Sequence, residues 1–239
     1  MTPAEFTGFR PAAFGFLRSL RRHNDREWFE RNRERYETEV RSPLSALAEE
    51  IDVRLAAIAP EIVGDPKRSL FRIHRDVRFS ADKSPYKTHV ACWFHHVDAG
   101  RGVGTQTPHG GAGFYFHMEA DRASTGGGIW MPPRPTLNRI REVIDEDARP
   151  LERILSAARR RFGGLAEENM LKRMPRGYEE SHVAATLLRH QSYTLGRELA
   201  PEDLLSAKLP DALARDFERL VPLVRWINGA LGLRTLARR

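Results

Sequence analysis

The stretch KRSLFRIHRDVRFSADKSPYKTHVACWFHHV, residues 67–97, decides the fold. Its pattern predicts two β-strands, at about 68–79 and 87–97, joined by a polar turn. Aromatic and β-branched residues alternate with charged ones along the first strand, as they do in a strand that buries one face. Ser, Asp and Pro between the two strands are typical turn residues. We therefore expect a pair of strands here, each half-buried.

The exposed face of the first predicted strand is rich in arginine. Two interpretations of this face remain open. In the first, it is a solvated surface on which Asp76 pairs with an arginine. In the second, its guanidinium groups form a cluster that binds a carboxylate or a phosphate, since planar bidentate donors suit these anions. Alternation along the strand assigns to this face Arg68, Leu70, Arg72, His74, Asp76 and Arg78, while Arg75 interrupts the apolar face.

The turn and the second predicted strand extend this positive surface. The chain has five lysines, and three of them fall within residues 67–87. Lys87 and His89 occupy alternate positions of the second strand, so they share one of its faces. If the pleats of the two strands align, this face joins the arginine-rich one.

We predict that this surface binds a small anionic ligand, such as a phosphate or carboxylate compound. Asp76 is expected to orient the cations, while Tyr86 and His89 complete the site. Asp76 and His89 are also the candidates for general acid–base catalysis, and the sequence leaves open whether the ligand is transformed. The predicted ligand-binding residues are Arg72, Arg75, Arg78, Lys83, Tyr86 and Lys87.

Much of the chain's positive charge is concentrated in the same region. The net charge is +7, and the isoelectric point is about 10.0. Residues 65–87 hold seven basic and three acidic side chains, so they contribute +4 of the +7. A compact patch suits a small anion at least as well as a polyanion. The alternative is a non-catalytic module that binds nucleic acid or an acidic protein, although the sequence has no RNA-binding aromatic motif and no zinc finger.

Several motifs of the chain are similar to those of one family. The central ones are Phe71-Arg72-Ile73, Arg75-Asp76-Val77-Arg78-Phe79-Ser80 and Asp82-Lys83-Ser84-Pro85-Tyr86-Lys87-Thr88. Others are Asn24 with Arg26-Glu27-Trp28-Phe29, Gly128-Ile129-Trp130 with Pro132, and Leu171-Lys172-Arg173 with Pro175 and Gly177-Tyr178. Together they resemble the family called domain of unknown function 2461 over nearly the whole chain. The resemblance implies a shared fold, and it implies no particular activity because that of the family is unknown.

Composition is that of a globular protein. The chain has 239 residues, of which 41% are hydrophobic, enough for a sizeable core. No apolar run is long enough to cross a bilayer, and the N-terminus lacks the pattern of a secretory signal. Cys92 is the only cysteine, which excludes an intramolecular disulfide and fits a reducing compartment. We expect a cytoplasmic protein with no cofactor and no membrane partner.

A metal site is the first alternative chemistry. If three strands lie side by side, Asp76, His89 and His117 share a face and could supply ligands. However, no His-Glu-x-x-His spacing fixes two ligands on one helix, and the neighbouring arginines disfavour a cation. We therefore predict no metal.

The rest of the chain predicts helices on both sides of the sheet. Apolar residues recur at helical spacing over about 11–20, 28–40, 42–58, 137–155 and 213–231. Further strands are expected at 112–119 and 127–131, with an edge strand near Tyr193. The glycine-rich span 100–113 is expected to be a loop, and Gly100–Gly104 lacks the Lys-Ser/Thr pair that follows a phosphate-binding loop.

These patterns predict a single α+β domain over residues 1–239. Its short connections favour an antiparallel meander, with N-terminal and C-terminal helices packed on the sheet. We expect a helical part at 1–64, the central sheet at 65–135 and a mainly helical part at 136–239.

Overall fold

The strands form a curved antiparallel sheet in the order of the sequence. The computed structural model describes residues 5–78, 81–99 and 110–237. Each strand pairs with the next one along the chain, so the sheet is a meander and the predicted α+β fold class is confirmed. The strands are β1 (Ile62–Val63), β2 (His89–His96), β3 (Gly113–Glu119), β4 (Ala123–Ile129) and β5 (Tyr193–Leu199).

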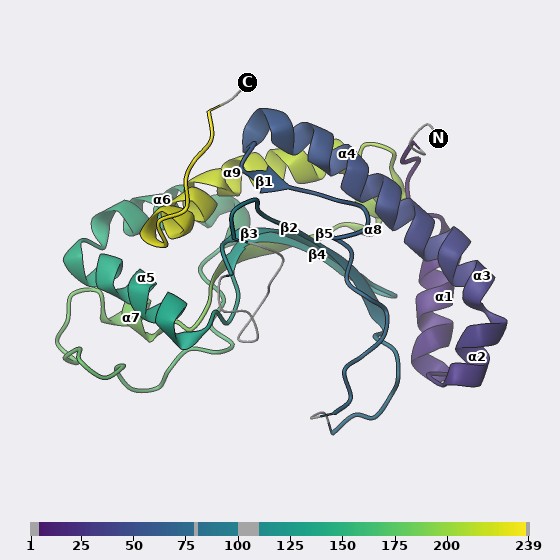
Figure 1. Ribbon diagram of the computed structural model, residues 1–239, viewed down its shortest axis with the longest axis horizontal. Helices are drawn as coiled ribbons and strands as arrows, with labels where there is room; N and C mark the ends of the chain where they lie inside the picture. The colour runs from purple at the N-terminus through teal and green to yellow at the C-terminus, as the bar shows by residue number, and fades with distance from the viewer. Residues whose placement is uncertain (1–4, 79–80, 100–109, 238–239) are drawn as a thin grey trace.

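Helices cover one face of this sheet and lie at both of its ends (Figure 1). The N-terminal helices are α1 (Pro11–Arg22), α2 (Arg26–Arg31), α3 (Arg33–Arg35), the π-helix η1 (Tyr36–Arg41) and α4 (Ser42–Ile58). The later helices are α5 (Arg134–Glu146), α6 (Arg149–Phe162), α7 (Ala185–Arg189), α8 (Pro201–Leu205) and α9 (Leu209–Ala230). The long helices α4 and α9 run over the convex face, so the concave face of the sheet points away from them (Figure 1).

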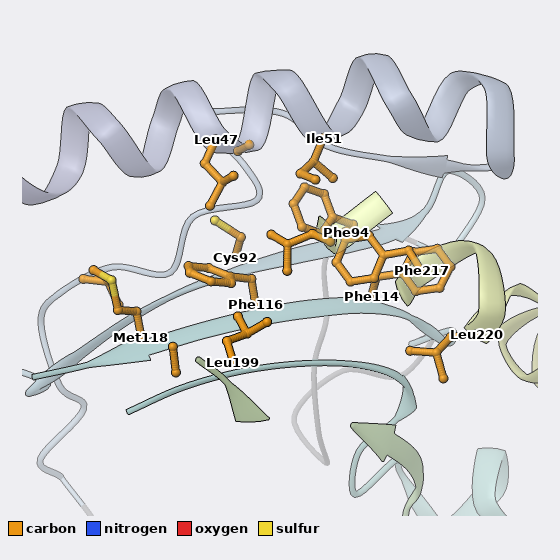
Figure 2. Close-up of a cluster of buried hydrophobic side chains, with 14 of the residues drawn as sticks. Leu47, Ile51, Cys92, Phe94, Phe114, Phe116, Met118, Leu199, Phe217 and Leu220 are labelled. Atoms are coloured by element: carbon orange, nitrogen blue, oxygen red, sulfur yellow. The ribbon is translucent and has the colours of Figure 1, made fainter. Parts of the chain in front are cut away.

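The hydrophobic core fills the space between the convex face and these two long helices (Figure 2). Because side chains alternate along a strand, every second residue of β2 and β3 points into this core. Phe114 of β3 stacks on Phe217 of α9, with ring centroids 4.7 Å apart. The labelled core side chains in Figure 2 are Leu47, Ile51, Cys92, Phe94, Phe114, Phe116, Met118, Leu199, Phe217 and Leu220.

The expected strand at 68–79 is not formed. Residues 68–78 contain only two isolated bridges, from Leu70 to Cys92 and from His74 to Tyr86. Local side-chain hydrogen bonds compete with strand pairing in this segment. The Asp65 carboxylate accepts from the backbone N–H of Arg68, and the Asp76 carboxylate accepts from both the backbone and the guanidinium of Arg78.

The sheet also extends beyond its expected limits. β4 begins at Ala123, before the expected strand at 127–131, because a tight turn returns the chain from Glu119 to Arg122. The edge strand expected near Tyr193 is β5, so the last strand comes from the part expected to be mainly helical. Most of the glycine-rich span, residues 100–109, lies outside the described residues.

The helices begin at residues that sequence preferences favour at helix starts. Asp25 caps α2, since its carboxylate accepts from the backbone N–H of Trp28 at 2.8 Å. Proline opens α1, where a missing backbone N–H has no consequence, and Pro43 is the second residue of α4, directly after η1. Within the described part of the chain, no helix combines the length and the apolar character needed to cross a membrane.

Candidate functional site

A cavity of about 910 Å³ lies on the concave face of the sheet, on the side opposite the core. It is within the size range of pockets that hold small ligands. β2 and β3 provide one wall, with His89, Trp93 and Tyr115. The segment 164–169, which follows α6, contributes to the other side, and glycines of β4 and β5 form the floor.

Strand register explains which side chains meet in this cavity. Residues that pair directly across an antiparallel sheet lie on the same face. Trp93 pairs with Tyr115, Tyr115 with Gly126, and Gly126 with Gly196. This row of paired residues across the sheet therefore has aromatic side chains on β2 and β3 and no side chain on β4 and β5.

Lys87 provides a positive charge at one end of the cavity. Its ammonium nitrogen lies 5.2 Å from the ring centroid of Phe71, which in turn meets Tyr115 edge-on at 6.2 Å. Burial lowers the pKa of Lys87, and the nearby guanidinium groups of Arg72 and Arg75 lower it further. Among the residues that the structure describes, no carboxylate forms an ion pair with Lys87.

His89 is a neutral imidazole in the cavity wall. Burial lowers its pKa to about 4, and the charges of His117 and Lys87 act in the same direction. The ring centroids of His89 and His117 are 4.6 Å apart. At neutral pH the His89 ring can therefore accept a proton or a hydrogen bond, and it carries no charge of its own.

A chain of hydrogen bonds runs along β3 beside the cavity. The Tyr115 hydroxyl lies 3.1 Å from Nδ1 of His117, and Nε2 of His117 lies 2.9 Å from Glu119. Hydrogen bonds from Arg122 and His117 lower the pKa of Glu119, so its carboxylate is ionised and can only accept. His117 then carries its proton on Nε2, and Tyr115 donates to Nδ1. Burial raises the pKa of Tyr115 to about 12, so this hydroxyl stays protonated.

Of the predicted site residues, Lys87 and His89 line the cavity, and most of the others lie on the segment that precedes them. This segment projects from the edge of the sheet (Figure 1). Arg72 and Lys83 are exposed, and Lys83 donates to the backbone carbonyl of Val77. Arg75 is paired with Asp82.

The predicted orienting residue, Asp76, pairs with one arginine on that segment. Arg78 donates to both oxygens of Asp76, at 2.9 Å and 2.6 Å. These hydrogen bonds lower the pKa of Asp76 to about 2. Both side chains are largely exposed, so the pair matches the first interpretation of the arginine-rich face, a solvated surface. Asp76 is not among the residues that line the cavity with His89.

Tyr86 belongs to the core. It stacks on Phe29 with ring centroids 4.1 Å apart, and only 2% of it is exposed. The side-chain amide of Asn24 donates to the backbone carbonyl of Tyr86 and accepts from its backbone N–H. Tyr86 therefore anchors the projecting segment to the N-terminal helices, and it does not line the cavity.

The metal alternative finds no geometric support. Within residues 5–78, 81–99 and 110–237, no group of three His, Cys, Asp or Glu side chains could hold a metal ion. Of the three candidate ligands, His89 and His117 are neighbours, but Asp76 is occupied by Arg78.

Sequence reasoning did not assign several residues of the cavity. Trp93, Tyr115 and Trp130 are aromatic lining residues, and Glu168 and Asn169 lie far from the central motif in sequence. One feature of the sequence pointed to the floor: the run Gly126-Gly127-Gly128 inside a strand, because glycine in a strand marks a close approach of another backbone or of a ligand.

The chain belongs to the family described as "Conserved hypothetical protein (DUF2461)", whose model matches residues 12–226. The matched range includes every residue that lines the cavity. The comparison with curated proteins found no match, and the comparison with solved structures found none either.

Proposed function

We propose that this member of DUF2461 binds a small anionic ligand, with a carboxylate or phosphate group, in the cavity on the concave face of the sheet. One observation carries the proposal: Lys87 is half-buried in the cavity wall, and it has no ion-pair partner in the described part of the chain. A buried cation normally has a counter-ion, because burial removes it from water. The ligand supplies that counter-ion.

The surrounding charges favour an anion at this end of the cavity. Arg72 and Arg75 lie close enough to Lys87 to lower its pKa, so their positive potential reaches the same place. An anion bound there relieves the repulsion between the three cations. Glu168 and Glu198 also line the cavity, but neither contributes to the pKa shift of Lys87, and their carboxylates disfavour the acid group of the ligand on their side.

The cationic residues of the proposed site are not equivalent. Arg75 and Arg78 already pair with Asp82 and Asp76, so neither can meet a ligand without giving up or sharing its carboxylate. Lys87 is therefore the main binding cation of the proposal, and Arg72, which does not line the cavity, adds positive potential from beside it. If the ligand is also transformed, His89 is the neutral base that lines the cavity.

Cys92 takes no part in this chemistry. Its side chain is fully buried in the core, and burial raises the pKa of its thiol. A nucleophilic cysteine needs a lowered pKa and access to the ligand. The lone buried thiol is consistent with the proposed cytoplasmic location.

Replacing Lys87 tests the proposal. Thermal-shift and calorimetric titrations with inorganic phosphate, benzoate and citrate should identify at least one anion that binds the wild-type protein. K87Q should weaken that binding at least ten-fold, because a hydrogen bond to a charged group is lost. Affinity for the wild type should fall as pH rises through the lowered pKa of Lys87.

The exposed Lys208, at the start of α9, provides a matched control. K208Q removes the same charge and should leave the affinity unchanged. K87Q should not lower the melting temperature, since it removes a half-buried charge that lacks a carboxylate partner in the described part of the chain. Equal weakening by both variants, or no binding of any anion, would contradict the proposal.

A further inference from the structure

We infer that the ligand carries a flat ring, so that its class is an aromatic or heteroaromatic acid. This inference rests on the proposed function, which places the acid group of the ligand at Lys87. It adds the part of the ligand that the rest of the cavity binds. The ring lies over the glycine floor of β4 and β5 and is bounded by the aromatic side chains of β2, β3 and the rim.

The floor is an area of bare backbone. Gly126 and Gly196 pair directly, and Gly128 is next to them on the same face of β4. Neighbouring strands are about 4.8 Å apart, and successive residues on one face about 6.8 Å apart. This area matches the footprint of one or two fused six-membered rings. A side chain at any of these three positions would cover part of the floor.

The glycines are fixed by the approach of the two strands. A Cβ atom on Gly126 would lie 2.6 Å from the backbone oxygen of Leu195. Gly128 has a φ of +131°, a conformation that other residues rarely adopt, and its Cβ would lie 2.0 Å from the oxygen of Tyr193. The bare floor is therefore a rigid feature of the sheet.

Trp93 forms part of the aromatic wall of the cavity. It is a lining residue, and only 8% of its surface is exposed. Tyr115, beside Trp93, adds a second aromatic side chain to the same wall.

Trp130 supplies an aromatic surface at the rim. Although it lines the cavity, 51% of its surface is exposed, which is unusual for a tryptophan without a partner. The next residue, Met131, has a φ of 41°, and its backbone N–H donates to Ser192 at 2.9 Å. A strained backbone at this position fixes the turn after Trp130. A ring on the glycine floor would cover part of the exposed indole.

Two acids of equal carbon number test the inference. 2-Naphthoate is flat, whereas decahydro-2-naphthoate has the same skeleton and charge in a puckered form. Calorimetric titration of the wild-type protein should show 2-naphthoate binding at least ten-fold more tightly. W130A should weaken the binding of 2-naphthoate about ten-fold and that of the puckered acid less than two-fold, because the stacking surface is lost.

V183A is the control, since Val183 is an exposed apolar residue that does not line the cavity. It should leave both affinities unchanged. If the two acids bind equally well and both depend on Lys87, the ring inference is wrong and the proposed function stands. If neither acid binds while inorganic phosphate does, the ring inference is again wrong. If no anion binds at all, the proposed function fails with it.

Discussion

At the residue scale, the neutral His89 makes stability depend on pH. Its pKa is about 4 in the folded protein and about 6.5 in an unfolded chain. Between these values the unfolded chain binds more protons, so stability decreases as pH falls from 6.5 towards 4. The cost at pH 5 is about 2 kcal/mol. Burial is the main cause of this low pKa, and the titratable groups that also act on it are His117, Lys87, Arg75 and, with the opposite sign, Glu119.

We predict that H89Q reduces this loss of stability in acid. Urea unfolding at pH 7 and pH 5 should show a smaller difference for H89Q than for the wild type, by about 2 kcal/mol. The exposed His23 serves as control, and H23Q should behave as the wild type does. An unchanged difference in H89Q would show that other groups cause the acid sensitivity.

Residues of the candidate site differ in how far the sequence could place them. Lys87 and His89 lie in or just before a regular strand, where alternation determines which way a side chain points. Tyr86 follows Pro85, before regular pairing begins, so its direction depends on Asn24 and Phe29, which are distant in sequence. No pattern within residues 67–97 could therefore predict these two contacts.

At the element scale, Asp216 of α9 connects three elements. Arg161 of α6 donates a hydrogen bond from Nε to one carboxylate oxygen, and Arg197 of β5 donates one from Nε to the other; Nη2 of each arginine forms an ion pair with the same oxygen. The carboxylate is buried, with 1% of the side chain exposed. This arrangement holds α9 against the strand that borders the cavity.

D216A should destabilise the protein by about 3 kcal/mol, because it leaves two arginines without their shared partner. The value is at the low end for a buried pair, since Arg161 is about half exposed and can be solvated. Urea unfolding at pH 7 measures this loss of stability. The matched control is D147A, which removes an exposed carboxylate paired with Arg149 and should hardly change the midpoint. Similar effects of the two substitutions would mean that α9 is held by apolar packing alone.

The elements themselves were largely predictable where apolar periodicity was strong. The helix at 42–58 and the strands at 87–97 and 112–119 match α4, β2 and β3 closely. The segment at 68–79 has the alternation of a strand, yet turns around Asp65 and Asp76 prevent regular pairing. In β4, the sequence Ala-Ser-Thr-Gly-Gly-Gly has no large apolar residue, so its first half gave no strand pattern.

At the scale of the whole molecule, many of the arginines are part of ordinary helix surfaces. Arg31, Arg33 and Arg41 each pair with a glutamate three or four residues away on the same helical stretch. Such exposed pairs contribute little to stability and are screened by salt. The excess positive charge is instead on the projecting segment near the cavity, where Arg72 and Lys83 are exposed.

This distribution distinguishes a small ligand from a nucleic acid. In a plot of log K against log salt, a small acid held by Lys87 should show only a shallow slope, because it has no condensed counter-ions to release and salt merely screens its ion pair. A duplex held by Arg72, Arg78 and Lys83 should show a slope of about −3, since each phosphate contact releases counter-ions. Because Arg78 is paired with Asp76, we predict no measurable binding of a 20-base-pair duplex at physiological salt. Fluorescence anisotropy over a salt series measures the affinity for the duplex and its dependence on salt. Tight duplex binding with the steep slope, abolished in R72A/R78A/K83A and retained in K87Q, would instead favour the nucleic-acid module.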